Sequence, residues 1–265
     1  MKKNLVKEKI KNNIPSIGTW VSTGDPFVCE VISRLGLDWI TIDLEHNAVD
    51  FSQLVHCFRA IQGSSSTPFV RVPWNDRQVI KRVLDIGAMG IVIPDIKDPE
   101  DAMNAVSACR YPPVGLRGIG ASRPNTVYGD DYYQNANDEI CVVLMIEDIK
   151  AVEKIDDILN VSGIDVIFIG PNDLASSMGL SLGMDNKHPE HQEAVNKVYQ
   201  ACSNRGIPMG IHCGDGKEVE KRINEGMLWM PIASDVRLLK FSFEEELKKI
   251  SNFDSISQKD GKTFY

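Results

Sequence analysis

Short apolar runs alternate along the chain with longer stretches in which apolar residues have helical spacing. Eight runs rich in β-branched and aromatic residues can be counted, at residues 16–21, 39–44, 69–72, 90–94, 141–146, 165–169, 208–212 and 227–232. Most are continuously apolar, which is typical of strands that are covered on both faces. The pattern therefore predicts eight buried strands with helices between them.

Helix-start and helix-end signals fall in the stretches between these runs. Asp25, Asp50 and Asp98 precede apolar-periodic stretches, and Pro26 and Pro99 occupy first helical positions, where a missing N–H costs little. Glycines suited to a left-handed cap stand near the other ends, at Gly36, Gly63, Gly87, Gly206 and Gly226. A strand and a helix repeated eight times predict one (β/α)₈ TIM barrel over residues 1–265. The alternative, an open doubly wound sheet, needs a Gly-rich phosphate turn after an early strand, and Gly18-Thr19-Trp20 is not such a turn.

Two segments depart from the repeat. Residues 111–139 contain three prolines and four glycines and are too long for an ordinary helix-to-strand connection, so we expect an active-site loop there. Residues 252–265 form a polar tail, for which we expect frayed structure.

Composition narrows the possible partners. The 265 residues are 43% hydrophobic and 25% charged, and no apolar run approaches the roughly 18 residues of a membrane span. A formal charge of -8 disfavours nucleic acid, because phosphate binding requires clustered cations. The charged N-terminus does not resemble a secretory signal, so we expect a cytoplasmic protein. Six scattered cysteines without a C-x-x-C pair are interpreted as reduced apolar residues.

Acidic side chains follow the fifth and sixth predicted strands. In a barrel of this kind the carboxyl ends of the strands build the active site, and Glu147 and Asp173 stand there on neighbouring strands. Two such carboxylates make half of an oxygen-rich site suited to Mg²⁺ or Mn²⁺, with water and substrate completing it. The alternative is structural: Glu147 pairs with an Arg or Lys, and Asp173 caps the following helix.

Two basic side chains lie at the second and third strand ends. His46 has the pKa range of a general base, and Asp43, three residues earlier, is placed to orient its ring; a purely structural histidine is the alternative. Arg71 stands in an apolar strand, so it must meet either an anionic substrate or an acid such as Glu45 or Glu147.

Other polar residues near the strand ends carry weaker signals. The turn Gly170-Pro171-Asn172-Asp173 opens a helix, whose first N–H groups favour a substrate carboxylate. His212 ends the seventh strand and is assigned a supporting place behind the pocket. His188 and His191 lie three apart on a polar stretch and are expected to be solvated; the alternative is a metal held by both on one helix face.

Several segments together resemble the metal-dependent HpcH/HpaI aldolases, which cleave or form 2-keto-3-deoxy sugar acids and 4-hydroxy-2-oxo diacids. The matching segments are Trp-Ile-Thr-Ile-Asp-Leu-Glu-His at 39–46, Phe-Val-Arg-Val-Pro at 69–73, residues 84–88, residues 110–118, Ile-Glu at 146–147 and Phe-Ile-Gly-Pro-Asn-Asp-Leu at 168–174. They occur in family order between about residues 18 and 234, nearly the whole chain.

The resemblance implies a barrel of the phosphoenolpyruvate/pyruvate type and a set of roles. Glu147 and Asp173 would hold a divalent metal, Mg²⁺ or Mn²⁺ before Co²⁺ or Zn²⁺, which chelates pyruvate or a 2-oxo acid. His46, oriented by Asp43, would act as base, and Arg71 would stabilise the enolate. The remaining implied contributors to the substrate site are Gly170, Pro171, Asn172, Asp173, Met145 and Trp20. Family members are usually hexamers built as trimers of dimers, so Asp85 would reach a neighbour's His46 and Asp43.

One position departs from the family pattern. Many relatives carry Gln two residues before the metal-binding Glu, where this chain has Met145, whose thioether donates no hydrogen bond. Substrate recognition is expected to differ accordingly, and Asn47-Ala48 after His46 also departs from the frequent Ala-Pro. The predicted function is a homo-oligomeric, divalent-metal-dependent aldolase (carbon–carbon lyase) that reversibly cleaves a 4-hydroxy-2-oxo acid to pyruvate and an aldehyde. The alternatives are a citrate-lyase-type enzyme acting on an acyl-CoA ester and a non-catalytic barrel used as an assembly module.

Overall fold

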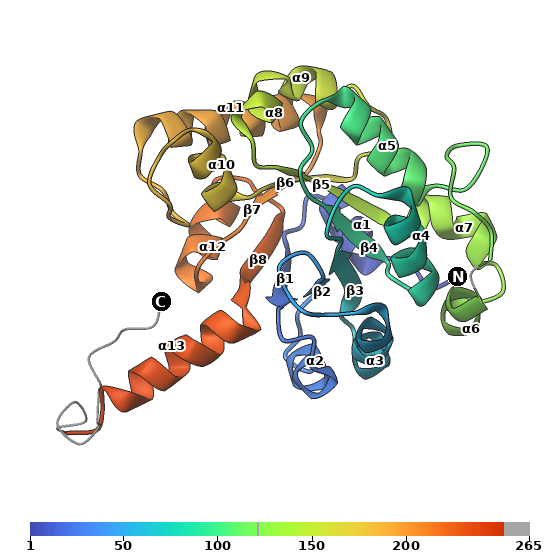
Figure 1. The fold of residues 1–265 in the computed structure, drawn as a ribbon, viewed down its shortest axis with the longest axis horizontal. Coiled ribbons are helices and arrows are strands. Elements are labelled where there is room, and N and C mark those ends of the chain that lie inside the picture. Colours follow the sequence, from blue (N-terminus) through green and yellow to red (C-terminus); the bar gives the residue numbers. More distant parts are fainter. Residues whose placement is uncertain (121, 252–265) are drawn as a thin grey trace.

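The computed structural model describes residues 1–120 and 122–251 and shows a parallel barrel surrounded by helices (Figure 1). The strands follow the order β7-β6-β5-β4-β3-β2-β1-β8, and a parallel bridge between Cys213 and Ile232 joins the two ends. The strand bounds are β1 Ser16–Val21, β2 Trp39–Asp43, β3 Thr67–Arg71, β4 Gly90–Ile93, β5 Cys141–Ile146, β6 Val166–Ile169, β7 Met209–Ile211 and β8 Trp229–Ser234. The eight predicted strands and the (β/α)₈ barrel are confirmed.

The outer layer is helical, and its helices begin where the sequence signals place them. Asp25, Asp50 and Asp98 each accept hydrogen bonds from backbone N–H groups of the helix that follows. Gly87 and Gly206 end their helices in the left-handed conformation. The helix bounds are α1 Leu5–Lys11, α2 Pro26–Ser33, α3 Phe51–Ile61, α4 Arg77–Ile86, α5 Pro99–Cys109, α6 Ser122–Tyr128, α7 Tyr132–Glu139, α8 Ile149–Glu153, α9 Ile155–Ile158, α10 Pro171–Ser177, α11 Pro189–Arg205, α12 Gly216–Asn224 and α13 Asp235–Leu247.

Aromatic rings fill the inside of the barrel. The indoles of Trp39 and Trp229 stack with centroids 3.9 Å apart, and Phe69 lies 5.9 Å from Trp229. Gly18 and Gly90 face these rings so closely that a Cβ at either position would overlap Trp39 or Phe69. The barrel interior below the carboxyl ends of the strands is therefore filled by side chains.

Residues 111–139 do not form one long loop. They contain α6 and α7, and Glu139 receives hydrogen bonds from Lys3 Nζ at 2.6 Å and from the backbone N–H of Asn4 at 2.7 Å. Prolines and glycines here separate short helices, and none of the described residues of this segment lines the pocket at the carboxyl ends of the strands. The segment packs against α4 and the start of the chain, so a part in the active site stays a prediction.

Three other sequence predictions concern the chain as a whole. The six cysteines are free and buried, as expected. Within the described residues, no helix combines the length and apolarity that a membrane crossing requires. The polar tail at residues 252–265 lies outside the described residues.

Candidate active site

A pocket of about 260 Å³ opens at the carboxyl ends of the strands. All contributing residues except Met184 stand at or just beyond the end of a strand, because parallel strands present these ends to the same side of a barrel. The lining residues are Trp20, Ser22, Asp43, His46, Arg71, Met145, Phe168, Gly170, Pro171, Asn172, Asp173, Met184, His212 and Ser234.

Arg71 is held at one side of this pocket by two carboxylates. Its Nε and Nη2 donate to the two oxygens of Asp43 at 2.8 and 2.7 Å, and its Nη1 lies 2.9 Å from Glu45 Oε2. The guanidinium also lies 4.8 Å from the centroid of the Trp20 ring. Burial alone would raise the pKa of Asp43, but the hydrogen bonds from Arg71 outweigh it and hold this pKa below its ordinary value. Arg71 is thus fixed as a cation whose position does not depend on a ligand.

His46 lies beside Glu45 and not beside Asp43. Its Nε2 is 3.4 Å from Glu45 Oε2, and its side chain is 63% exposed. The oxygens of Asp43 are already taken by Arg71, by Asn47 Nδ2 at 2.6 Å and by the backbone N–H of Glu45 at 3.1 Å. The geometry within one chain therefore assigns the orienting contact to Glu45, where the sequence predicted Asp43.

Glu147 and Asp173 stand beyond the neighbouring strands β5 and β6. Glu147 Oε1 accepts the backbone N–H of Asp95 at 2.8 Å, and its Oε2 lies against Gly170, where a Cβ would come within 2.6 Å. Burial, followed by the negative charges of Glu45 and Asp173, raises the pKa of Glu147 to about 7. Asp173 lines the pocket itself, whereas Glu147 borders it through Gly170.

This pair of carboxylates fits a divalent cation. Both offer oxygen donors, which Mg²⁺ and Mn²⁺ prefer, and a buried carboxylate crowded by like charges is stabilised by a cation. No group of three or more His, Cys, Asp or Glu side chains suited to a metal ion is found in the described part of the chain. Two protein ligands would leave the remaining positions to water and substrate, and the assignment of Glu147 and Asp173 as those ligands stays a prediction.

The histidines behind the rim differ from one another. His212 lies between Trp20 and Phe168, with ring centroids 5.8 and 6.4 Å away, and burial lowers its pKa to about 4. It lines the pocket as a neutral ring. The prediction that His191 is solvated is wrong: it is 2% exposed and its Nε2 lies 3.0 Å from the carbonyl oxygen of Pro171, because α11 packs behind the Gly170–Asp173 turn. His188 is exposed, as predicted.

Asp85 lies away from the pocket of its own chain. It stands on α4 and pairs with Arg117 at 2.9 Å. Its predicted reach into a neighbouring subunit stays a prediction.

Four lining residues were missed from the sequence. Ser22 and Ser234 follow or end strands β1 and β8, and Phe168 points inward from β6, so the rule that strand ends build the site would have found them. Met184 stands in a loop between α10 and α11, and no local pattern marks it.

Comparisons with known proteins identify the family. A family model described as HpcH/HpaI aldolase/citrate lyase matches residues 16–240. The chain belongs to the HpcH/HpaI aldolase/citrate lyase family. The resemblance seen in the sequence is confirmed.

Relatives within the HpcH/HpaI family are similar over most of their length. The chain is 35% identical to the 5-keto-4-deoxy-D-glucarate aldolase of Shigella sonnei, covering 84% of this chain and 88% of that one. It is 36% identical to the 4-hydroxy-2-oxo-heptane-1,7-dioate aldolase of Salmonella dublin, covering 89% and 90%. A crystal structure of a family protein from Burkholderia cenocepacia superposes with a TM-score of 0.88 at 32% identity, covering 93% and 99%.

Proposed function

We propose that this HpcH/HpaI family member is a divalent-metal-dependent aldolase that reversibly cleaves a 4-hydroxy-2-oxo acid to pyruvate and an aldehyde. One observation carries the proposal: Glu147 and Asp173, two carboxylates that form no ion pair within residues 1–120 and 122–251, share a rim with a cation that is already fixed, Arg71. The names of the relatives support aldol chemistry over the acyl-CoA lyase and the non-catalytic alternatives.

The cleavage reaction sets clear demands on this rim. A base removes the proton of the 4-hydroxyl group, the C3–C4 bond breaks, and its electron pair stays on C3 as the enolate of pyruvate while the aldehyde leaves. The enolate then takes a proton at C3. The protein must therefore supply positive charge near the keto oxygen and a group that moves a proton.

The residues of the chain fit these demands. Arg71 presents a fixed guanidinium that stabilises developing negative charge without reorganising, since Asp43 and Glu45 hold it in place. His46 is the proposed base, and its partner is Glu45, whose pKa burial raises to about 7. Trp20 and Met145 form the apolar wall of the same pocket.

Glu147 and Asp173 are the proposed ligands of Mg²⁺ or Mn²⁺, and Co²⁺ and Zn²⁺ also accept carboxylate oxygens. When bound, such an ion supplies Lewis-acid stabilisation at the keto oxygen of the substrate. The turn from Gly170 to Asp173, with Pro171 and Asn172 between them, lines the pocket beside these ligands and is the proposed site of the substrate carboxylate.

We also propose a homo-oligomer in the cytoplasm, with a hexamer as the expected size. Helix α13 projects away from the barrel (Figure 1) and buries none of its described residues within the chain. It carries large apolar side chains that are 41–62% exposed, namely Val236, Leu238, Leu239, Phe241 and Phe243. Exposed apolar surface of this kind supports contact with another copy, which sedimentation of the wild type and of the double variant Phe241→Glu, Phe243→Glu will test.

The decisive experiment is turnover with and without metal. Purified protein is treated with a chelator, then supplied with Mg²⁺ or Mn²⁺, and incubated with pyruvate and a panel of aldehydes, and adducts are identified by mass. We expect adducts that depend on the added ion, and pyruvate release from them in the reverse direction. Undiminished turnover in the chelated protein would refute metal dependence, and cleavage of acyl-CoA esters alone would favour the lyase alternative.

A further inference from the structure

The loop between α10 and α11, residues 179–188, forms one wall of the proposed catalytic pocket. Met184 from this loop lines the pocket, and the backbone N–H of Gly183 donates to Asn172 Oδ1 at 3.0 Å. Asn172 belongs to the turn that we propose as the carboxylate site. The loop thus contacts the reaction site directly, through both a side chain and a hydrogen bond.

The middle of this loop has little backbone support. In the described part of the chain, no backbone-to-backbone hydrogen bond involves residues 181–187. Hydrogen bonds inside the loop come from Asn186, whose Nδ2 donates to Ser181 O at 2.8 Å and whose Oδ1 accepts the N–H of His188 at 2.9 Å. The position of the loop relative to the barrel must therefore be set by side-chain contacts with its neighbours.

Asn172 makes some of these contacts, accepting from the N–H of Gly183 and donating to Met184 Sδ at 3.9 Å, and Asp185 makes the charged ones. Asp185 Oδ1 lies 3.0 Å from Lys221 Nζ and 3.3 Å from Arg222 Nη2, both on α12, and its Oδ2 pairs with Lys187 in the loop itself. The Asp185 side chain is 32% exposed and that of Arg222 is 12% exposed, so the pair with Arg222 is shielded from water better than an ordinary surface pair. One carboxylate thus joins the residue next to Met184 to the outer layer of the barrel.

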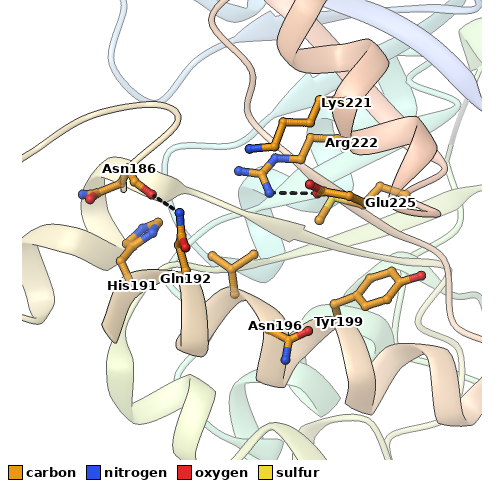
Figure 2. A pocket seen from close by; sticks show the side chains of 10 residues that line it. Asn186, His191, Gln192, Asn196, Tyr199, Lys221, Arg222 and Glu225 are labelled. Atoms are coloured by element: carbon orange, nitrogen blue, oxygen red, sulfur yellow. Dashed lines mark hydrogen bonds and ion pairs between the residues drawn. The ribbon is translucent and has the colours of Figure 1, made fainter. Parts of the chain in front are cut away.

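Figure 2 shows the other side of this connection. A cavity of about 380 Å³ separates Lys221 and Arg222 from Asn186 and from helix α11. Gln192 on α11 donates a weak hydrogen bond of 3.5 Å to Asn186 O (Figure 2). The ion pairs of Asp185 join the same loop to α12. Because the loop borders a cavity instead of a packed surface, apolar packing cannot replace the ion pairs if they are lost.

We propose that Asp185 is a positioning residue that fixes Met184 as the wall against which the aldehyde half of the substrate binds. This inference rests on the proposed aldolase function. The loop carries none of the groups that we propose to hold the metal, move the proton or stabilise the enolate. We therefore expect it to contribute to binding of the longer 4-hydroxy-2-oxo acid and not to the chemistry of the enolate.

The test compares Asp185→Asn, which removes the charge at constant size, with two controls. Asp156→Asn breaks an exposed pair with Arg205 (2.8 Å) on the outer helices, and Asp185→Glu keeps the charge. We expect Asp185→Asn to raise the KM for the hydroxy-oxo acid about tenfold, or about 1.4 kcal/mol of binding. Its kcat and its rate of pyruvate methyl-proton exchange should change less than about twofold, since the reacting groups stay in place. Both controls should resemble the wild type, and Met184→Ala should reproduce the KM effect.

A second measurement does not require turnover. Amide hydrogen exchange should rise across residues 181–187 in Asp185→Asn and not in either control. If the wild type shows no aldolase activity, the proposed function fails, and this exchange pattern alone decides whether Asp185 fixes the loop. An unchanged KM in an active enzyme, a kcat that falls in parallel with pyruvate exchange, or unchanged exchange over the loop would each overturn the inference.

Discussion

The buried carboxylates on the two sides of the pocket are stabilised in different ways. Beyond β2 and β3, the carboxylates of Asp43 and Glu45 share one guanidinium, and each charge has an opposite charge within 3 Å. Beyond β5 and β6, Glu147 is partnered by one backbone N–H, and neither it nor Asp173 forms an ion pair among the described residues. The first side is complete in the protein alone. We propose that an added cation completes the second side, so that the charges of the first side serve the fold and those of the second serve the reaction.

The largest effect is expected from removing a carboxylate charge beyond β5 and β6. Glu147→Gln should lower metal-stimulated pyruvate release about a thousandfold, because removing a ligand charge weakens the ion whose stabilisation is worth several kcal/mol. The free energy of unfolding of the metal-free protein should not fall, since an amide still accepts the Asp95 N–H and no longer carries a desolvated charge. Glu153→Gln, an exposed change on α8, is the control. Full activity together with lower stability would mean that Glu147 serves the fold.

Removing a carboxylate charge beyond β2 and β3 should act mainly on the free energy of unfolding. Asp43→Asn leaves the buried guanidinium of Arg71 with one carboxylate instead of two, and breaking a buried pair costs about 3 kcal/mol. Asp156→Asn, which breaks an exposed pair, should cost less than about 1 kcal/mol. Urea unfolding of the three proteins measures both values. Equal stabilities for the two variants would show that Arg71 does not depend on Asp43.

The fold followed from patterns that are local in sequence. Continuous apolar runs and Asp-Pro helix starts are set by burial on both faces and by backbone capping, and these act within a few residues. All eight predicted strands are present: the bounds coincide at 16–21 and 141–146, and elsewhere they are shifted by one or two residues, as at 227–232 predicted and 229–234 observed. Asp50 and Asp98 cap the helices that were predicted after them. The segment 111–139 was harder, because its prolines and glycines mark turns without saying whether short helices lie between them.

The site followed only in part, because contacts between loops are not local. The strand-end rule collected Asp43, Arg71 and Asp173 in one pocket. It could not show that Arg71 donates to both oxygens of Asp43 or that His46 therefore lies beside Glu45. These contacts depend on side-chain rotamers, which the sequence pattern does not specify. Met184 was missed because an ion pair 36 residues along the chain, from Asp185 to Lys221, places its loop.

The next prediction concerns proton transfer by His46, the proposed base. His46→Ala should slow exchange of the pyruvate methyl protons about a hundredfold, the usual contribution of a positioned base. His56→Ala, an exposed change on α3, should leave exchange unaltered. The measurement follows deuterium uptake into pyruvate by NMR. If His46→Ala exchanges at the wild-type rate, the base lies elsewhere at the rim, and Glu45 becomes the next residue to replace.

Stability at acid pH reports on His212, which lies between the two sides. Burial, together with the positive charges of Arg71 and Arg237, lowers its pKa to about 4, against about 6.5 in an unfolded chain, and Asp43 opposes this only weakly. Between these two pKa values the unfolded state binds a proton at His212 and the folded state does not. The contribution of neutral His212 to the free energy of unfolding is therefore complete above pH 6.5 and is lost as pH falls toward 4. In His212→Gln, the free energy of unfolding should decrease over this pH range by about 2 kcal/mol less than in the wild type. Urea unfolding at each pH measures this difference. An unchanged pH dependence, with the exposed His188→Gln as control, would mean that His212 is charged in the folded protein.

The smallest effect is expected at Met145, on the side of the proposed metal ligands Glu147 and Asp173. Its side chain is 2% exposed, and its Cε lies 3.4 Å from the position of a Cβ on Gly170, so it touches the turn proposed to hold the substrate carboxylate. Met145→Gln introduces an amide donor there, whereas Met145→Leu keeps the site apolar at similar volume. The amide should change the ratio of kcat/KM between two aldehydes, one bearing a hydroxyl next to the carbonyl and one without it, by less than about tenfold. Because the two carboxylates and Arg71 are untouched, pyruvate methyl exchange should stay constant. Equal ratios in the three proteins would show that the acceptor aldehyde does not reach β5, and recognition would then fall to Met184 and its loop.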